Sequence, residues 1–536
     1  MPMLSALAHS LTSQLNAQLP TPLDKTDASP YTPPTDLTPG IINRRTHLLF
    51  AEGDIKISRI VDWDPSDPAK PEILNNYLQV ETGDRADHLH VRSWPGDKLQ
   101  ILINGKPHVI DIKEERDRNQ ELWIDTTGGD DTVIIDDDVK LRVTVEGGDG
   151  HDFIQAGGGR SRLYGGLGND TLRLGSGLGY AEGNDGNDTL IGGSGNTVMY
   201  GNKGSDLLLA GFGPTHKQSY LDGGDDGDVL VSGSGHTVAH GGNQNDVLIG
   251  NHFGRTTFYT GKGNNEIWNN QRHDRIYASA NDRFDRTTGS AFTEVKPSNV
   301  GEQGFTVEGV TGASEEQQQA FRQRVADDFE FLRSSPIGQQ ALTKMDELAV
   351  TNGGKVTVRQ EGNANTSYLF DASQEHEESY VEEASSTADD VPEDTGVPAS
   401  YFIENGVAGD ARADLATITY DPAATRERAD GKHTWVPVTQ LFHEIGHAYN
   451  GATGTFLDGV TTEHLHPGKE LQVNNFERQV VGLPNDADPF DFDNDPSTAP
   501  GTINPKPFTE NALSEEMGKP LRRFVTLETS EQGDGT

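Results

Sequence analysis

The sequence contains no cysteine, which excludes disulfide bridges, thiolate metal sites and cysteine nucleophiles together. It also contains no apolar run near the roughly 18 residues of a membrane-spanning helix, and no insertion segment of the kind that a pore-forming toxin needs. Basic residues are few, since 43 Lys and Arg stand against 84 Asp and Glu and give a net charge of −41. This balance argues against nucleic acid and anionic membranes as partners, because phosphate binding needs clustered cations.

Hydrophobic residues make up only 33% of the 536 positions, so part of the chain must be built from repeats or be disordered. The first stretch, Met1 to Leu23, has no Asp, Glu, Lys or Arg and lacks the basic start of a Sec signal. It resembles type III secretion leaders, and a plain disordered tail fits its composition equally well. We predict a disordered leader over residues 1–40 and a β-rich capping region over 41–127, where apolar and polar residues alternate.

The most informative motif is Phe442–Asn450, which reads HExxH from His443 to His447. Residues four apart on a helix share one face, so the two histidines can present their imidazoles to one zinc ion. Glu444 can then take a proton from water held at an open metal position. Val438, Leu441, Ile445 and Ala448 support a helix by their spacing, and we predict Gly451 as its C-cap. The alternative is a structural helix that carries two histidines.

A catalytic zinc site needs a third protein ligand. The metzincin class is excluded, because the chain has Asn450 and Thr453 where that class requires Gly and His. We predict Glu477 as the ligand, since Glu470–Val481 has the apolar spacing of a helix and a helix-borne carboxylate is rigid. The alternative for Glu477 is a solvated carboxylate that pairs with Arg478. The other downstream donors are Asp458, Glu463, His464, His466 and Glu470, and the two histidines stand in a predicted loop.

Three blocks of the C-terminal half resemble the NleD-like effector zinc peptidases. The blocks are Phe442–Asn450, Asn475–Pro484 and Thr509–Gly518, in the order that this family has. The resemblance covers the chain from about Phe305 to its end. It implies a peptidase that pathogenic bacteria inject into host cells, where family members cleave signalling proteins such as MAP kinases.

A nine-residue unit recurs along the middle of the chain, as in Gly147–Gln155, and strong units return at Gly165, Gly183, Gly201, Gly223 and Gly241. Weaker units lie between them, so the strong units recur at twice the nine-residue spacing, with one four-residue insertion around Phe212 to Ser219. Repetition on this scale indicates a solenoid in which each unit is a Gly-rich turn followed by a short apolar strand.

With two units per coil, equivalent residues of successive coils stack about 4.8 Å apart. A single column of aspartates results: Asp152, Asp170, Asp188, Asp206, Asp228 and Asp246. Such a column needs counterions, and oxygen-rich turns suit calcium. The repeats resemble the RTX haemolysin-type calcium β-roll, which we place at residues 128–270. On the opposite edge Arg162, Thr197 and Thr237 stand where aspartate would be, so we predict calcium on one edge only. A metal-free Gly-rich solenoid is the alternative.

A linker is predicted over residues 271–304, and the metallopeptidase domain over 305–536. A capping box of Ser314 and Gln317 opens one predicted helix and Pro336 opens the next. The acidic stretch Glu375–Asp394 is predicted to be a disordered loop, and Ala413–Tyr420 a strand next to the HExxH helix.

We therefore predict a multidomain protein: an all-β N-terminal half that ends in a calcium β-roll solenoid, then an α+β zincin-like metallopeptidase domain. The predicted function is a secreted bacterial zinc endopeptidase, a virulence effector that cleaves host signalling proteins. Zn²⁺ and Ca²⁺ are the predicted cofactors; a protein substrate, host kinases included, and a secretion machinery are the predicted partners. Secretion with translocation into the host cytoplasm is the predicted location. The alternative is a secreted calcium-binding adhesion protein with a non-catalytic C-terminal domain.

Overall fold

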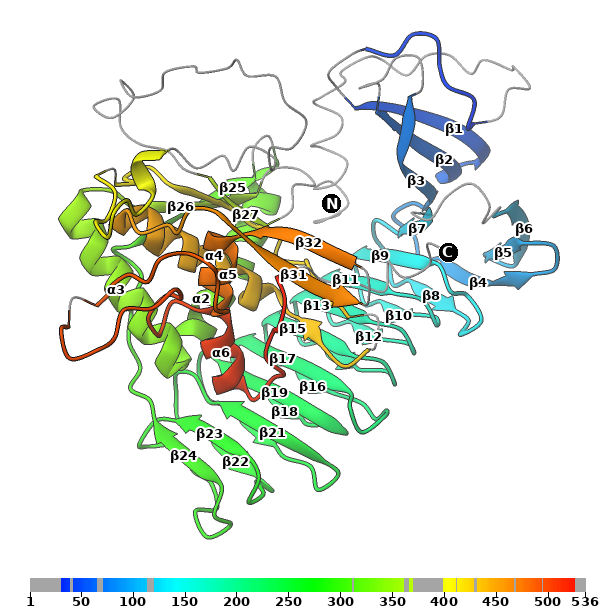
Figure 1. Cartoon of the computed structure of the whole chain (residues 1–536). Helices are drawn as coiled ribbons and strands as arrows, with labels where there is room; N and C mark the ends of the chain where they lie inside the picture. The colour runs from blue at the N-terminus through cyan, green and yellow to red at the C-terminus, as the bar shows by residue number, and fades with distance from the viewer. Residues whose placement is uncertain are drawn as a thin grey trace. The chain divides into compact units, whose positions relative to one another are not determined.

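The computed structural model describes residues 30–38, 42–64, 71–112, 120–310, 313–360, 366–369, 399–410, 412–428, 431–466, 469–493 and 495–525 (Figure 1). The predicted acidic loop Glu375–Asp394 lies outside these residues, as does the predicted leader apart from residues 30–38. The chain divides into two compact units, the first built mainly from residues before Arg275 and the second mainly from residues after Arg324. Within the described residues, no helix is both long enough and apolar enough to cross a membrane.

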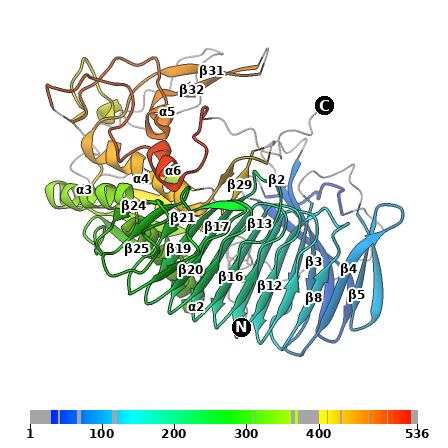
Figure 2. The same ribbon diagram turned by 90° about the horizontal axis from the view of Figure 1, so that it is seen from below.

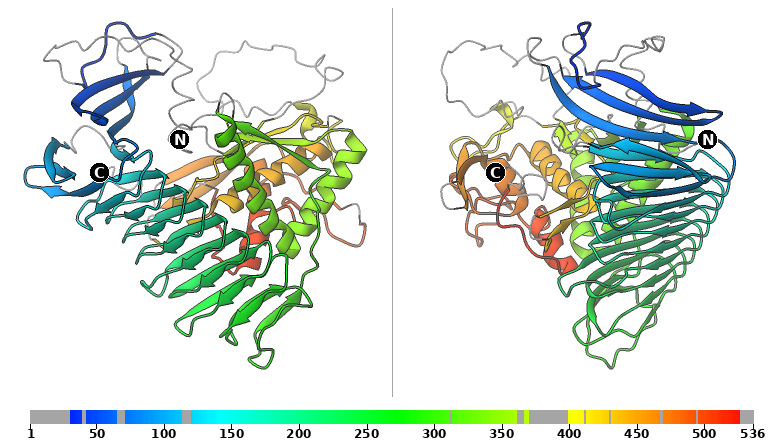
Figure 3. Two further views of the ribbon diagram at one scale, coloured as in Figure 1. Left: turned by 180° about the vertical axis from the view of Figure 1, so that it is seen from behind. Right: turned by 90° about the vertical axis from the view of Figure 1, so that its right-hand side faces the viewer.

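Two long sheets make up most of the first unit, and Figure 2 and Figure 3 show their strands stacked side by side. The 13-stranded sheet runs in the order β1 (Asn43–Glu52), β2 (Ile55–Asp64), β3 (Glu72–Glu81), β7 (Gln120–Asp125), β9 (Arg142–Asp149), β11 (Ser161–Leu167), β13 (Gly179–Asp185), β15 (Thr197–Lys203), β17 (Gln218–Asp225), β19 (Gly235–Gly242), β21 (Gly254–Tyr259), β23 (Arg275–Ala278) and β24 (Ala291–Glu294). The 11-stranded sheet runs in the order β22 (Glu266–Trp268), β20 (Val247–Ile249), β18 (Val229–Val231), β16 (Leu207–Leu209), β14 (Thr189–Ile191), β12 (Thr171–Arg173), β10 (Phe153–Gln155), β8 (Thr132–Ile135), β4 (His88–Trp94), β5 (Lys98–Ile103) and β6 (Lys106–Asp111).

The strand register confirms the predicted solenoid, which makes about nine turns. Leu172 pairs in parallel with Leu190, its equivalent one coil later, and Leu190 pairs with Leu208. The four-residue insertion lengthens only the next step, from Leu208 to Leu230. These leucines are fully buried, as are Leu163, Ala181, Met199 and Leu221 of the other sheet. The interior of the coil is therefore a continuous apolar core between two parallel sheets.

The glycines of the strong repeats are required by the close stacking of successive turns. A Cβ atom at Gly165 would lie 2.3 Å from Asp170 Oδ2 and 2.6 Å from the carbonyl oxygen of Gly183. A Cβ at Gly186, where φ is +152°, would lie 1.6 Å from the carbonyl oxygen of Gly168. Neither position has room for a side chain, which explains why the repeat keeps glycine there.

The solenoid also extends beyond the regular repeats. In the capping region β3 pairs in parallel with β7 and β4 with β8, so both sheets begin before the first glycine repeat. Residues 271–304, which the sequence predicts to be a linker, contain β23 and β24 at the other end of the first sheet. The linker prediction is wrong for these strands, because Ile276 and Ala278 keep the alternation of a buried strand without any glycine repeat.

The C-terminal half contains helices and a small sheet, in agreement with the predicted α+β class. The sheet has the order β25 (Phe305–Val310), β26 (Val356–Gln360), β28 (Thr417–Thr419) and β27 (Ser367–Leu369). The helices are α2 (Glu315–Ser334), α3 (Pro336–Asn352), α4 (Pro437–Thr453), α5 (Asn475–Val481) and α6 (Glu510–Met517), with a short 3₁₀ turn at Ala399–Tyr401. Two further strand pairs are β29 (Arg426–Glu427) with β30 (Thr434–Trp435), and β31 (Val460–His466) with β32 (Lys469–Asn474).

Helix starts follow the sequence signals, whereas one predicted helix end does not. Ser314 and Gln317 exchange the hydrogen bonds of a capping box, and Ser335 caps α3 just before Pro336. Helix α4 extends to Thr453, and its C-cap is Gly454, whose backbone is left-handed, in place of the predicted Gly451. Gly451 lies inside the helix, where a Cβ atom would come 2.4 Å from the hydroxyl oxygen of Tyr368. Glycine is therefore needed at position 451 for close packing and at position 454 for the left-handed helix cap.

Two strand assignments also differ from the sequence predictions. Residues 470–474 belong to β32, so the predicted helix Glu470–Val481 is wrong over its first turn and α5 begins at Asn475. The predicted strand Ala413–Tyr420 is reduced to β28, which lies inside the sheet, and β27 is the edge strand beside it. Leu471 and Val473 suit a strand period of two as well as a helix, which explains the first error.

Candidate metal centres

Helix α4 carries His443 and Glu444 on one turn and His447 on the next. The helix is buried over most of its length and packs against α5. Gly446 permits this contact, since a Cβ atom there would lie 2.6 Å from Cγ1 of Val480. The close approach of the two helices brings Glu477 of α5 to the histidines of α4.

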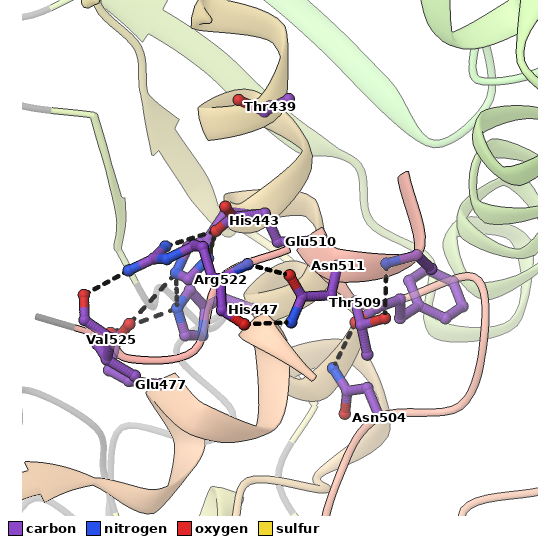
Figure 4. A network of polar contacts seen from close by, with 12 residues as sticks. Thr439, His443, His447, Glu477, Asn504, Thr509, Glu510, Asn511, Arg522 and Val525 are labelled. Atoms are coloured by element: carbon purple, nitrogen blue, oxygen red, sulfur yellow. Dashed lines mark hydrogen bonds and ion pairs between the residues drawn. The ribbon is translucent and has the colours of Figure 1, made fainter. Parts of the chain in front are cut away.

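The structure brings His443, His447 and Glu477 together in one cluster (Figure 4). The two Nε2 atoms lie 3.1 Å apart. Oε2 of Glu477 lies 3.2 Å from His443 Nε2, and Oε1 lies 3.4 Å from His447 Nε2. Among the described residues, these three side chains form the single group of histidine and acidic donors whose ligand atoms converge closely enough to hold a metal ion.

The other nitrogen of His443 faces a second carboxylate. Nδ1 lies 3.1 Å from Oε2 of Glu510, the first residue of α6, and this oxygen also accepts a hydrogen bond of 2.5 Å from Arg522. Burial lowers the pKa of His443, but hydrogen bonds to Glu477 and Glu510 outweigh it and raise the pKa to about 10. The two carboxylates therefore favour the positively charged form of this imidazole.

Glu444 is buried beside the histidines. Burial raises its pKa, while His443 and His447 oppose the shift. The pKa of Glu477 moves the other way: burial would raise it, but His447 and His443 hold it well below its usual value. Glu444 therefore holds a proton more readily than an exposed glutamate does, whereas Glu477 stays ionised.

The alternative third donors lie elsewhere. His464 and Glu470 pair with each other across β31 and β32 at 3.1 Å and are mostly exposed, so the loop predicted for the histidines is a strand pair. Glu463 is buried and accepts hydrogen bonds from Arg478 and from the backbone N–H of Val525. Asp458 is exposed at the end of the segment that follows α4.

Glu510 and Arg522 also belong to this region, although no sequence pattern pointed to either of them. Glu510 stands in one of the three quoted blocks, but it is 67 residues from His443 and no local spacing links them. Arg522 lies outside all three blocks. Only the tertiary fold places these charges beside the histidines.

The first unit contains the predicted column of aspartates. Oδ1 of each aspartate accepts the backbone N–H of the aspartate one coil earlier, as in Asp152 N to Asp170 Oδ1 at 2.8 Å. The same bond repeats from Asp170 to Asp188, from Asp188 to Asp206, from Asp206 to Asp228 and from Asp228 to Asp246. The other oxygen, Oδ2, is buried in all six residues and has no hydrogen-bond partner within the described residues.

A Cβ atom built on the first glycine of each strong repeat would meet both an Oδ2 atom of the column and a backbone carbonyl oxygen within 2.8 Å, so both kinds of oxygen line the same space. Burial raises the pKa of each aspartate, although the backbone hydrogen bonds oppose it. The raised values are about 6 for Asp152, about 7 for Asp188, Asp206 and Asp246, about 8 for Asp170 and about 10 for Asp228. A row of buried, unpartnered carboxylate oxygens beside carbonyl oxygens suits a hard divalent cation such as calcium.

The column is longer than the sequence indicated. Asp87 donates its N–H to Asp131 and Asp131 donates to Asp152, which adds two aspartates before the first strong repeat. At the other end Asp246 donates to Asn265, and Asn265 donates to Asp282. The unequal spacing of these four residues hides them from a search for a regular period.

Within the described strands, the opposite edge has no aspartate column. The strand register aligns Ser161, Gly179, Thr197, Ser219, Thr237 and Thr256. Arg162 pairs with Tyr180 and therefore lies one residue after the aligned position, which Ser161 occupies. The prediction that Arg162 stands in place of the aspartate is wrong. The weak repeats lack the aspartate that would mark this position in the sequence. Lys217, from the four-residue insertion, is buried there and donates to the carbonyl of Gly195 and the hydroxyl of Thr197.

Comparison with protein families identifies both regions. Residues 311–524 match the Peptidase M91 family, described as an effector protein, and residues 146–179 and 182–214 match the RTX calcium-binding nonapeptide repeat. The chain therefore combines a region that matches an effector peptidase family with a region of RTX calcium-binding repeats. Neither the curated proteins nor the solved structures gave a match.

The matched ranges can be compared with the two candidate sites. The effector peptidase range includes His443, Glu444, His447, Glu477 and Glu510. The RTX range includes the column from Asp152 to Asp206, and the unchanged hydrogen bonding carries the same geometry on to Asp228 and Asp246. A peptidase effector acts on a protein, and its RTX repeats support calcium binding.

Proposed function

We propose that this chain is a secreted zinc endopeptidase in which His443, His447 and Glu477 hold the zinc ion. The convergence of two Nε2 atoms and one carboxylate within a peptidase domain carries this proposal. Two imidazoles and one carboxylate are a common donor set of catalytic zinc, and they leave a fourth position open.

The distances support this donor set. Ligand atoms roughly 2.0–2.1 Å from a tetrahedral zinc ion lie about 3.3 Å from one another. The two Nε2 atoms are 3.1 Å apart. His443 Nε2 lies 3.2 Å from Oε2 of Glu477, and His447 Nε2 lies 3.4 Å from Oε1 of the same carboxylate. The bond from His443 Nδ1 to Glu510 also leaves Nε2 as the nitrogen that offers its lone pair to a metal.

Zinc held there would polarise the scissile carbonyl and lower the pKa of a bound water. Glu444 would accept the proton of that water and return it to the nitrogen of the leaving amine. Its raised pKa suits this work, because a general acid and base works best when its pKa is near the working pH.

Strand β27 is the candidate binding strand for an extended substrate. It is an edge strand, paired with β28 on one side only among the described strands. Its Tyr368 ring lies 6.4 Å from the ring of His447, centroid to centroid. A substrate segment that adds to this edge therefore passes close to the cluster. The substrate itself is a host protein, with signalling kinases as the first candidates on the resemblance to NleD-like peptidases.

We assign calcium to the aspartate edge of the solenoid alone. The unpartnered Oδ2 atoms support this edge, and the buried ammonium of Lys217 supports a metal-free opposite edge. Sites of the extracellular type fill at about 10⁻⁴–10⁻³ M calcium, so the roll binds its calcium after secretion.

The experiment is a search for new N-termini in host-cell lysate incubated with the zinc-loaded full chain. The control is the Glu444→Gln variant, which keeps the proposed ligands. We expect new termini with the native chain alone, and their loss when a zinc chelator is added. If the zinc-loaded native chain produces no termini beyond those of the variant, the calcium-binding adhesion function replaces the endopeptidase.

A further inference from the structure

The segment that follows α6 returns to the cluster of His443, His447 and Glu477 and is held there by several polar contacts (Figure 4). The backbone of Arg522 exchanges two hydrogen bonds with the side chain of Asn511, at 2.8 and 3.1 Å. The N–H of Val525 donates to both carboxylate oxygens of Glu463, at 2.8 and 3.1 Å. Arg522 also donates to the carbonyl of Val525. Hydrogen bonds to Asn511 therefore hold the backbone of Arg522, and the bond to Val525 holds its guanidinium.

This guanidinium acts on Glu510. Oε2 of Glu510 accepts one hydrogen bond from Arg522 at 2.5 Å and lies 3.1 Å from Nδ1 of His443. The Glu510 and Arg522 side chains are only 2% and 9% exposed. Glu510 and Arg522 therefore form an ion pair inside the protein.

Glu510 is not one of the converging ligand donors. Its oxygen faces Nδ1 of His443, whereas Glu477 and His447 face Nε2 of the same ring. The two nitrogens of an imidazole point in different directions, so the two carboxylates bind opposite edges of one ring. Glu510 is thus placed to set the tautomer and orientation of His443 without touching the metal.

We propose that Glu510, oriented by Arg522, is a positioning residue that accepts the Nδ1 proton of His443 and thereby presents Nε2 to the metal. This inference rests on the proposed zinc site. A hydrogen-bond acceptor behind a ligating histidine fixes the ring and increases its basicity, and loss of such an acceptor typically weakens metal binding about 10- to 100-fold. The C-terminal segment thereby becomes part of the metal site although it supplies no ligand.

The test compares zinc affinity among variants of the full chain by competition with a chromogenic zinc chelator. Glu510→Ala removes the acceptor, Glu510→Gln keeps an oxygen without the charge, and Arg522→Met removes only the support. Glu515→Gln is the matched control, because Glu515 lies on the same helix, is exposed and pairs with Lys506. We expect zinc binding about 10- to 100-fold weaker for Glu510→Ala, a smaller loss for the other two, and no loss for the control.

Two further readouts separate positioning from general stability. The visible spectrum of the cobalt-substituted chain reports ligand geometry, and we expect it to change in the Glu510 variants but not in Glu515→Gln. The unfolding midpoint of each zinc-free variant shows whether the fold is intact; if Glu510→Ala does not fold, Glu510→Gln and Arg522→Met decide. The inference is overturned if these variants bind zinc as the control does while His443→Ala has lost it. Absence of zinc binding in the native chain would instead overturn the proposed zinc site itself.

Discussion

The Nε2 atoms of His443 and His447 lie 3.1 Å apart, and both face the carboxylate of Glu477. At most one proton fits between two such nitrogens, and a carboxylate that faces both draws positive charge to the same point. A cation bound by all three groups would suit this arrangement, and the first predictions follow from that proposal.

Replacing Glu444 by Gln should keep the zinc and abolish proteolysis. The amide has nearly the same shape but cannot accept the proton of water, and general base catalysis contributes about 10²- to 10⁴-fold. Zinc content by elemental analysis and cleavage of an identified substrate are the measurements. If the variant cleaves at the native rate with full zinc, another group is the base.

Replacing Glu477 by Ala should weaken zinc binding strongly, because one of three protein ligands is lost. The matched control is Glu470→Ala, since Glu470 is an exposed carboxylate on the neighbouring strand β32 that pairs with His464. Titration with zinc distinguishes the variants. Equal affinities in both would remove Glu477 from the ligand set, and loss of zinc in His464→Ala alone would move the third ligand to β31.

Replacing Gly446 by Ala should destabilise the peptidase domain by about 1–3 kcal/mol. The added methyl would lie 2.6 Å from the buried Val480 side chain and would force α4 and α5 apart. Gly501→Ala is the control, because a Cβ atom there meets nothing within 4 Å. Thermal unfolding of both variants is the measurement, and equal midpoints would show that the helices have room to move.

Without calcium, the roll should lose stability as the pH rises from about 4 to 7. The unfolded aspartates release their protons near their usual pKa, whereas burial raises the pKa of Asp188 in the folded roll to about 7. The folded state therefore holds more protons over this interval. The free energy of unfolding then falls by about 1.4 kcal/mol per pH unit for each such aspartate.

Urea unfolding of the full chain in chelator, followed by far-UV circular dichroism at pH 5 and pH 8, measures this dependence. Millimolar calcium should remove most of it by stabilising the ionised column. Asp188→Asn is the control, since it keeps an acceptor at Oδ1 and removes one titrating group, so its slope should be smaller. A roll equally stable at both pH values in chelator would mean that the column carries no such penalty.

The sequence predicted the features that depend on local spacing. The interval of four residues places His443 and His447 on one helix face, and the doubled nine-residue repeat sets the register of Leu172 and Leu190. Glu477 was chosen from a helix predicted too long, yet α5 does carry it to the cluster. The spacing of Leu471 and Val473 fitted strand and helix alike, so the strand β32 could not be predicted.

Features that depend on tertiary contacts were beyond the sequence. Glu510 reaches His443 from 67 residues away along the chain, and Arg522 comes from further still. Lys217 could not be recognised as the buried cation of the second edge, because its role depends on where the insertion folds back. Asp87 joins the column through the pairing of β4 with β8, and Asp131 joins it through the pairing of β8 with β10.

Zinc analysis of the purified full chain, native and His443→Ala, tests the central claim most directly. We predict about one zinc ion per native molecule, because the cluster of His443, His447 and Glu477 forms one site. We predict that the variant loses this zinc while its far-UV circular dichroism stays native. A native chain without zinc, or a variant with the same zinc content as the native chain, would contradict the account.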